Sequence, residues 1–302
     1  MALKISVNGK HLSAPTGLSI FECSEKLGVH VPTSCNKNGK CKECIVEVNE
    51  GMDLLSGLCR EEEHLGGEFR LACRARLEAE SGSIRCHTMR RARMRIENSG
   101  WTKPGNDALE PAVRRDGEWV LLDGEPLVRT PGPLHGIALD LGTTTVVLRL
   151  LDLESGEQVA STSFENPQRF GGSDVMARIQ YDSDHPGRLL QRTLLSYLRH
   201  CIDDLDCDSA TIYAIVMAGN TTIRDLLFGL DVSSIGQRPY RSVTEHELEQ
   251  GLRESTTIES TAKKFPLPAF PQARVTSLPL ASGHVGVAAA ACPLAVGLAA
   301  PE

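Results

Sequence analysis

The chain lacks the sequence signals of a secreted or nucleic-acid-binding protein. No apolar core follows a basic start in the N-terminal stretch MALKISVNGK, so no secretory signal is visible and we expect a cytoplasmic protein. No long basic run is present either. The arginine cluster at residues 90–95 (RRARMR) is too short to outweigh a formal net charge of −7. This balance argues against a nucleic-acid partner.

The chain is, by contrast, rich in cysteine, with ten in 302 residues. In a cytoplasmic protein we expect metal ligands or free thiols more than disulfides. Cys35, Cys41 and Cys44 have the spacing C-x5-C-x2-C, and Cys73 follows with 28 residues between it and Cys44. A zinc site commonly has two C-x2-C pairs, and the second pair is missing. Four thiols with this spacing favour a 2Fe-2S cluster, with zinc and a non-binding cluster as the alternatives.

The spacing around the first three cysteines resembles that of 2Fe-2S ferredoxins. It is one residue longer than the plant-type C-x4-C-x2-C pattern and is similar to the adrenodoxin-like branch. The resemblance covers residues 1–88. It implies a β-grasp fold, with Cys35 and Cys41 on one iron and Cys44 and Cys73 on the other.

The local patterns of the first 88 residues predict a small α+β domain. LKISV and HLSA alternate around Asn8-Gly9, which predicts a hairpin. LSIFECSEKLG predicts a short helix with Cys23 in the core, and CIVEVNEG, EFRLAC and SIRCHTM predict strands. Acidic REEEHLGG also looks helical. Cys59 and Cys86 fall outside the ligand pattern, and we interpret them as small apolar residues in or near the core.

Two further segments follow the first domain. Residues 89–133 are rich in Pro, Gly and charge, which predicts a linker with one short strand or docking segment. Residues 134–302 begin with three alternating runs that predict an antiparallel meander, continue with two amphipathic helices, and then read as a buried strand, a polar turn and a helix. This part is predicted to be α/β, with helices covering a sheet.

The first turn of this second domain has the residues of a phosphate-binding loop. Asp140 ends a strand, Gly142 lets the backbone approach closely, and Thr143, Thr144 and Thr145 offer hydroxyls beside free N–H groups. Such a loop can hold phosphate while the carboxylate orients a hydrated Mg²⁺. A hairpin with Asp and Thr is common, so the loop alone is a weak signal.

The order of motifs is more specific. GIALDLGTTT, NPQRFGGSDVMARI, AGNTTIRDLLFG and RPYRSV, behind a ferredoxin pattern, resemble the reductive activators of corrinoid-dependent methyltransferase systems. The resemblance implies a ferredoxin domain, a linker and an ATPase related to actin and sugar kinases. It implies that the cluster delivers an electron to a Co(II) corrinoid, giving Co(I), in a step driven by ATP hydrolysis.

The same resemblance assigns partners and a nucleotide site. The electron acceptor would be a corrinoid protein or a corrinoid-dependent methyltransferase, and an upstream reductant would reload the cluster. Residues 140–145 correspond to the first phosphate loop of the family, and Asn220 and Thr221 to a turn near the cleft.

The resemblance runs from residue 1 to about residue 299. The final segment SLPLASGHVGVAAAACPLAVGLAAPE resembles the one that in the family leads into the second phosphate loop and the adenosine-binding half, and those parts are absent from this sequence. We therefore expect weak ATP-Mg binding and little ATPase activity, unless a second chain, as in a homodimer, supplies the missing lobe. The last 22 or so residues are nearly uncharged, and we interpret them as a core helix and not as a membrane span.

Two classes of function follow. In one, the protein is an iron-sulfur electron-transfer module that reduces a corrinoid, with a generic ferredoxin-type carrier as a simpler version. In the other, it is an ATP-binding regulator or kinase-like protein in which the cluster is a redox sensor. We favour the first, because the cluster ligands are complete and the nucleotide site is not.

Overall fold

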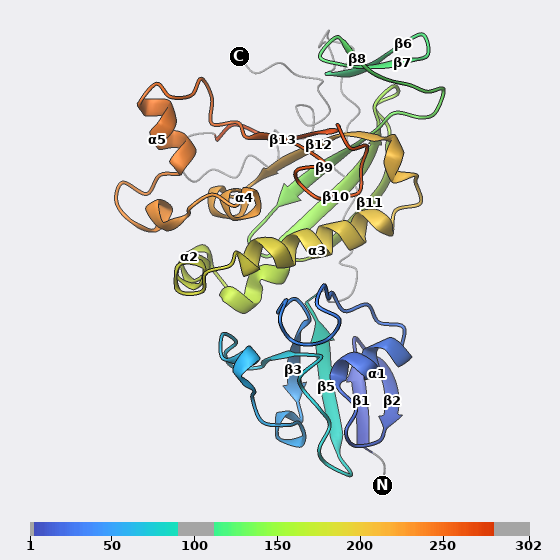
Figure 1. The fold of residues 1–302 in the computed structure, drawn as a ribbon, viewed down its shortest axis with the longest axis vertical. Helices are drawn as coiled ribbons and strands as arrows, with labels where there is room; N and C mark the ends of the chain where they lie inside the picture. The colour runs from blue at the N-terminus through green and yellow to red at the C-terminus, as the bar shows by residue number, and fades with distance from the viewer. Residues whose placement is uncertain (1–2, 90–111, 281–302) are drawn as a thin grey trace. The chain divides into compact units, whose positions relative to one another are not determined.

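The computed structural model describes residues 3–89 and 112–280 (Figure 1). These form two compact units, residues 3–89 with Glu165–Tyr197, and residues 112–164 with 198–280. The sequence-based domain bounds of 1–88, 89–133 and 134–302 stay predictions.

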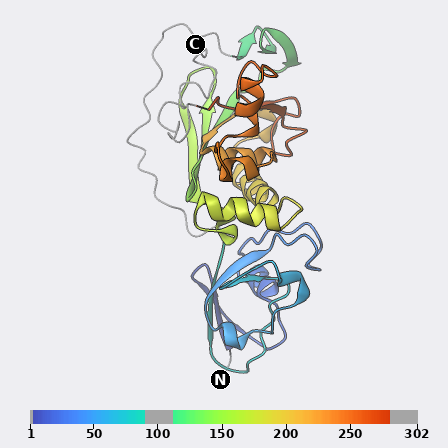
Figure 2. The same ribbon diagram turned by 90° about the vertical axis from the view of Figure 1, so that its left-hand side faces the viewer.

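The first unit contains a five-stranded mixed sheet with one helix against it (Figures 1 and 2). In the order β2-β1-β5-β3-β4, its strands are β1 (Leu3–Val7), β2 (Lys10–Ala14), β3 (Ile45–Glu50), β4 (Phe69–Leu71) and β5 (Ser83–Thr88). The predicted hairpin forms because Asn8 and Gly9 take left-handed φ angles of 51° and 79°. β1 pairs in parallel with β5. This is the β-grasp arrangement, and the α+β prediction is confirmed.

Helix α1 (Ile20–Lys26) lies where the sequence predicted it. A capping box starts it: the N–H of Glu22 donates to Ser19 Oγ at 3.2 Å, and the Ser19 N–H donates to the Glu22 carboxylate at 2.8 Å. Cys23 and Cys86 are fully buried, as their interpretation as core residues requires.

The connection from β3 to β4 holds two 3-10 turns, η1 (Met52–Leu54) and η2 (Arg60–Glu62). The acidic stretch that looked helical thus forms only the single turn η2. The later part of the first unit comprises η3 (Pro167–Gly171), α2 (Val175–Asp184) and the first half of α3 (Leu189–Asp203).

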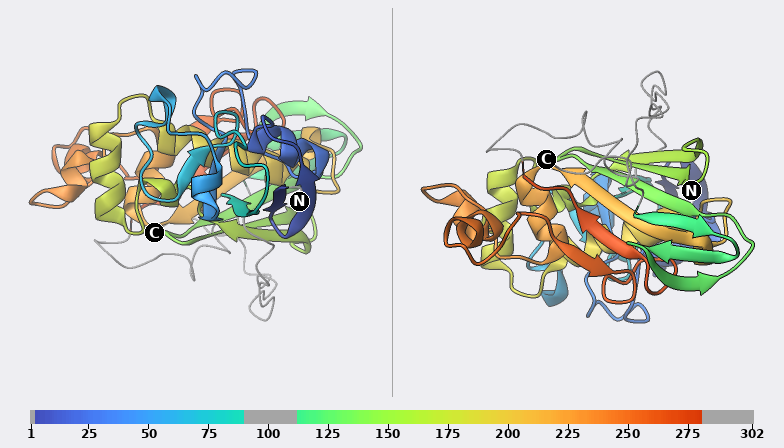
Figure 3. Two further views of the ribbon diagram at one scale, coloured as in Figure 1. Left: turned by 90° about the horizontal axis from the view of Figure 1, so that it is seen from below. Right: turned by 90° about the horizontal axis from the view of Figure 1, so that it is seen from above.

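The second unit is built on a six-stranded sheet (Figure 3, right). In the order β11-β10-β9-β12-β14-β13, its strands are β9 (His135–Leu141), β10 (Thr145–Asp152), β11 (Gln158–Glu165), β12 (Ile212–Gly219), β13 (Glu259–Thr261) and β14 (Arg274–Ser277). β12 runs parallel to β9 and to β14, whereas β10 is antiparallel to β9. The shorter elements of this unit are η4 (Ser209–Thr211), α4 (Thr221–Phe228), η5 (Ser233–Gly236) and α5 (Val243–Glu249).

The second unit also contains a three-stranded sheet in the region predicted as a linker. It consists of β6 (Val113–Asp116), β7 (Trp119–Leu122) and β8 (Glu125–Arg129). The sequence predicted one short strand or a docking segment here, and the structure has three strands, because positive φ angles at Gly117 (58°), Asp123 (52°) and Gly124 (86°) close two hairpins. Val113 and Val120 pack with Tyr213 of β12 in one apolar cluster.

No helix in the described part of the chain is both long and apolar enough to cross a membrane. The nearly uncharged C-terminal stretch that we interpreted as a core helix lies, from residue 281 on, outside the described residues.

Candidate metal centre

The loop between α1 and β3 carries three of the four predicted ligands. Four of its residues have left-handed φ angles: Asn36 (53°), Lys37 (65°), Gly39 (82°) and Lys42 (61°). Glycine adopts this region freely, whereas a non-glycine residue there costs roughly 1–3 kcal/mol. Such strain persists only where surrounding contacts hold it, and it gathers at functional sites.

Contacts to α1 and within the loop hold this conformation. Lys37 Nζ donates to the two carboxylate oxygens of Glu25 at 2.7 and 2.8 Å and lies 5.0 Å from the centre of the Phe21 ring. Ser34 Oγ donates to Glu43 Oε1 at 2.9 Å. Because Lys37 is paired with Glu25, its charge is partly neutralised before any partner arrives.

The four predicted ligands come together from two separate stretches of chain. Cys44 Sγ donates to Cys73 Sγ at 3.3 Å, and both thiols are buried. Thr33 Oγ1 lies 4.0 Å from Cys35 Sγ and 3.9 Å from Cys41 Sγ, so it bridges the other two. Hydrogen bonds thus link Cys35 with Cys41 and Cys44 with Cys73, and charge interactions also couple Cys35 with Cys73 and Cys41 with Cys44, so the two pairs lie close together.

Hydrogen bonds to sulfur shift the thiol pKa values. Burial opposes ionisation of Cys35, but hydrogen bonds from the N–H and thiol of Cys41 and from the N–H of Asn38 lower its pKa to about 7. The pKa of Cys73 is lowered by the hydrogen bond from Cys44 and also by the N–H of Gly39. The same bond to Cys73, together with burial, raises the pKa of Cys44. Backbone N–H groups directed at thiolates are what an iron-sulfur site requires.

The grouping of the thiols bears on the kind of metal site. Among residues 3–89 and 112–280, no set of three or more His, Cys, Asp or Glu side chains is arranged around one metal ion. A structural zinc site needs four donors around one ion, whereas a 2Fe-2S cluster takes two thiolates on each of two irons. Two thiol pairs match the donor count of a two-iron cluster.

A buried ion pair that the sequence did not predict braces the segment before Cys73. Arg70 Nε donates to Glu62 Oε1 at 2.9 Å and its Nη2 donates to Oε2 at 3.1 Å, while the Leu71 N–H donates to Oε1 at 2.8 Å. Burial opposes ionisation of Glu62, but the bonds from Arg70 and from the N–H groups of Leu71 and Cys59 keep its pKa below the usual value. The acidic run Glu61 to Glu63, which we interpreted as part of a helix, was the only signal, and it does not identify which carboxylate is buried.

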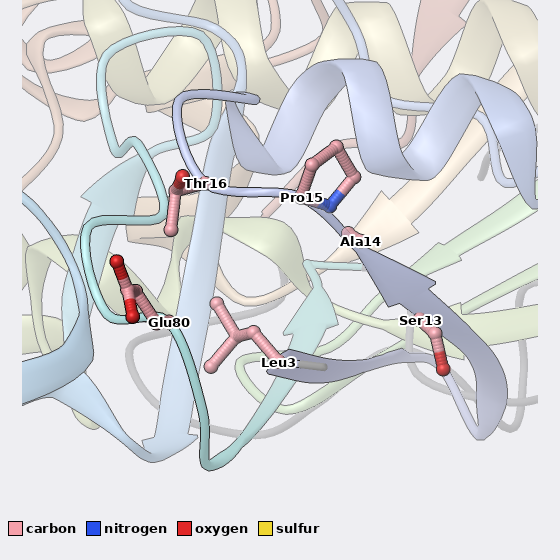
Figure 4. A pocket seen from close by; sticks show the side chains of 6 residues that line it. All are labelled: Leu3, Ser13, Ala14, Pro15, Thr16 and Glu80. Atoms are coloured by element: carbon pink, nitrogen blue, oxygen red, sulfur yellow. The ribbon is translucent and has the colours of Figure 1, made fainter. Parts of the chain in front are cut away.

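Two other features of the first unit are separate from the thiol pairs. The Cys59 thiol is partly exposed and hydrogen bonded to Arg74, and burial raises its pKa. A pocket of about 330 Å³ opens beside β1 and the end of β2 (Figure 4). Its lining residues are Leu3, Ser13, Ala14, Pro15, Thr16 and Glu80. None of these is a thiol, so the pocket is not part of the metal centre.

The predicted phosphate loop lies at the carboxyl ends of the parallel strands β9 and β12. Leu141 and Gly219 are paired at this edge, and the N–H of Asn220 donates to the Leu141 carbonyl at 3.3 Å. The Asn220 side chain accepts from the Thr222 N–H at 2.9 Å and caps α4. The loop 140–145 and the turn at Asn220 and Thr221 are therefore neighbours.

The loop itself is a tight turn. The Gly142 N–H donates to the Thr145 carbonyl at 2.9 Å, and a Cβ at Gly142 would lie 2.6 Å from that oxygen. This N–H is therefore engaged within the turn, and the close approach of the backbone at Gly142 is made to the turn itself. Burial raises the pKa of Asp140, and the charge of Arg149 opposes that shift. Thr144 is exposed.

Comparison with known proteins agrees with both halves of this description. Residues 5–78 match the 2Fe-2S iron-sulfur cluster binding domain, and residues 135–300 match the family described as the RACo middle region. A protein of Eubacterium limosum named "Corrinoid activation enzyme RamQ" is 30% identical over 172 residues, which are 55% of this chain and 27% of that protein.

A solved structure gives the same fold. It is titled "Reductive activator for corrinoid,iron-sulfur protein", is 21% identical, and aligns with a TM-score of 0.53 over 96% of this chain and 58% of that one. This chain thus covers less than two thirds of the length of either protein. The resemblance drawn from the sequence is confirmed: the chain belongs to the RACo middle region family and carries a 2Fe-2S iron-sulfur cluster binding domain ahead of that region.

Proposed function

We propose that the chain binds a 2Fe-2S cluster through Cys35, Cys41, Cys44 and Cys73 and uses it to pass one electron to a Co(II) corrinoid protein. The observation that carries the proposal is the meeting of four thiols from two stretches of chain, with N–H groups directed at them. Each iron would take one thiol pair, Cys35 with Cys41 and Cys44 with Cys73.

The acceptor is proposed from the relatives, whose names describe corrinoid activation. An upstream one-electron reductant would supply the electron. Cys35, Cys41, Cys44 and Cys73 would hold the cluster as a one-electron carrier, and the electron lost by its reduced form would be the one that takes cobalt from Co(II) to Co(I). We place the protein in the cytoplasm, because the cysteines of residues 3–89 form no disulfide and iron-binding thiols suit a reducing compartment.

Anaerobic purification tests the first step. We expect about two irons and two sulfides per chain, visible absorption, and an electron paramagnetic resonance signal after reduction. One zinc per chain with no visible absorption would exclude the proposal. The second step is tested by mixing the reduced protein with a Co(II) corrinoid protein and following loss of the Co(II) signal. Equal transfer to any redox dye, without binding to the corrinoid protein, would favour a generic ferredoxin.

ATP-Mg is a second candidate ligand, favoured by the neighbouring turns at 140–145 and 220–221. Asp140 would orient the metal, while Thr143, Thr144 and the N-terminus of α4 would face phosphate. A thermal shift at millimolar ATP-Mg that is lost in Asp140→Ala supports this site. No shift, with the cluster intact, contradicts it. Light scattering with and without ATP-Mg would show whether a homodimer forms.

A further inference from the structure

An arginine outside the ferredoxin-type sequence contacts the backbone of a predicted ligand. Arg192 lies in the first turn of α3, within the segment Glu165–Tyr197 that shares a compact unit with residues 3–89. Its Nη1 donates to the Cys41 carbonyl at 3.1 Å. Its Nε donates to the Gly187 carbonyl at 3.1 Å, which orients the guanidinium group.

The same guanidinium faces a carboxylate between two ligands. Arg192 Nη1 is 3.6 Å from Glu43 Oε1, and Glu43 lies between Cys41 and Cys44 in the sequence. Glu43 is only 8% exposed. A buried carboxylate this close to the cluster ligands disfavours added negative charge, and Arg192 offsets that effect.

A second arginine of the same segment holds the arrangement in place. Arg169 forms an ion pair with Glu47 of β3, which is buried, and its guanidinium lies 5.5 Å from the centre of the Phe69 ring. Arg169 and Arg192 thus contact β3 and the ligand loop before it. The position of Arg192 is therefore fixed by the fold of the first unit and not by one long side chain alone.

We propose that Arg192 tunes the reduction potential of the cluster, through its positive charge and its hydrogen bond to the backbone of Cys41. Reduction adds one electron and no counter-charge, so a nearby cation stabilises the reduced form and raises the potential. Removal of Arg192 makes the cluster a stronger electron donor. Because Arg192 belongs to the RACo middle region, a displacement of the start of α3 would have the same effect, which links that region to the driving force of electron transfer.

The exposure of the Arg192 side chain limits the expected change in reduction potential. The Arg192 side chain is 40% exposed, so water and salt weaken its field. We expect its removal to change the ratio of reduced to oxidised cluster at a fixed applied potential about three- to tenfold. A tenfold change corresponds to 59 mV for one electron.

The test is a redox titration of the iron-loaded protein, followed by visible absorption and paramagnetic resonance. Arg192→Gln should lower the potential, and Arg192→Lys, which keeps the charge, should restore most of it. Arg188→Gln is the matched control, since it removes the same charge from an exposed position four residues earlier. Equal potentials for wild type and Arg192→Gln, or an equal shift in Arg188→Gln, would overturn the proposal.

A second variant covers the case in which Arg192→Gln loses iron. Glu43→Gln removes the opposing charge and should raise the potential, and an unchanged or lowered potential contradicts the mechanism. This inference rests only on the cluster part of the proposed function. A protein that fails to reduce any corrinoid but shows these shifts would refute the acceptor and leave the role of Arg192 standing.

Discussion

The metal centre and the edge formed by β9 and β12 differ in where their backbone N–H groups point. At the metal centre, the N–H groups of Asn38, Gly39 and Cys41 bond to cysteine sulfur. At the sheet edge, the Gly142 N–H bonds to the Thr145 carbonyl and closes its own turn. The cysteine loop directs its N–H groups at the predicted metal ligands, while in loop 140–145 the Gly142 N–H makes a hydrogen bond within the loop. Four thiol ligands with backbone N–H groups directed at their sulfur atoms are therefore a stronger sign of a binding site than a turn whose Gly142 N–H is already bonded.

The two regions also differ in how their carboxylates are treated. Near the metal centre, Glu43, Glu47 and Glu62 each face an arginine. At the sheet edge, Asp140 is half-buried with a raised pKa, and Arg149 opposes that shift only through its charge. The carboxylates near the metal centre are thus neutralised by arginines. At the sheet edge, burial of the ionised Asp140 carboxylate lowers the stability of the fold.

The largest expected effect is loss of the cluster. Cys44→Ala removes one thiolate of four and leaves the Cys73 thiol without its hydrogen-bond donor, so iron should fall from about two per chain to a small fraction, with loss of visible absorption. Because cluster binding is coupled to folding, the first unit should also become easier to proteolyse. Cys59→Ala is the control and should keep both irons. Full iron content in Cys44→Ala would show that Cys44 is not a ligand and that the four thiols are not a complete metal site.

The buried ion pair should give the next largest effect. Glu62→Leu leaves Arg70 buried without its partner and should cost about 3–5 kcal/mol in the free energy of unfolding. Glu61→Gln is the matched control, because its pair with Arg74 at 3.3 Å is partly exposed and its loss should change little. The measurement is the denaturant midpoint of the anaerobic protein. Equal midpoints for the two variants would show that Glu62 does not brace the segment before Cys73.

The same pair predicts a pH dependence. The pKa of Glu62 is lowered in the folded state, so its stabilisation is complete above the unfolded value of about 4.3 and is lost as pH falls through the folded value. The deficit of Glu62→Gln relative to wild type should therefore be constant near neutrality and shrink in acid. A deficit that grows in acid contradicts this account.

The sequence predicted the parts of the molecule that depend on local order and ligand count. Asn8-Gly9 marked the hairpin, and the spacing of four cysteines marked the metal site. It did not predict the pair of Glu62 with Arg70 or the bond from Arg192 to Cys41, which are 8 and 151 residues apart. A charged residue that will be buried looks like an exposed one until its distant partner is known. The turn residues Gly117 and Asp123-Gly124 are visible in the sequence as hairpin signals, but we assigned this segment to a linker.

A smaller effect concerns docking at the ligand loop. Lys40 is exposed and Lys42 is half-exposed, whereas Lys37 is paired with Glu25. Lys40→Gln and Lys42→Gln should each slow electron transfer to an acidic acceptor about two- to threefold at low salt, with the difference vanishing at high salt. Lys4→Gln, the same change at the exposed position of the otherwise buried strand β1, is the control. A salt-independent loss would indicate damage to the cluster instead of weaker docking.

The smallest expected effect on stability tests the weaker side of the comparison. Burial raises the pKa of Asp140, so its ionised form at neutral pH disfavours the folded state, and Asp140→Asn should remove that penalty. The carboxylate is partly solvated, so the gain should be only about 0.5 kcal/mol, seen as a slightly higher melting temperature without nucleotide. If this sheet edge binds ATP-Mg, Asp140→Asn should lose the increase in melting temperature that ATP-Mg causes while keeping both irons. A residue that is needed for binding but lowers the stability of the fold behaves in this way. A variant that is less stable and still responds to ATP-Mg would show that Asp140 is a structural residue of the β9 turn.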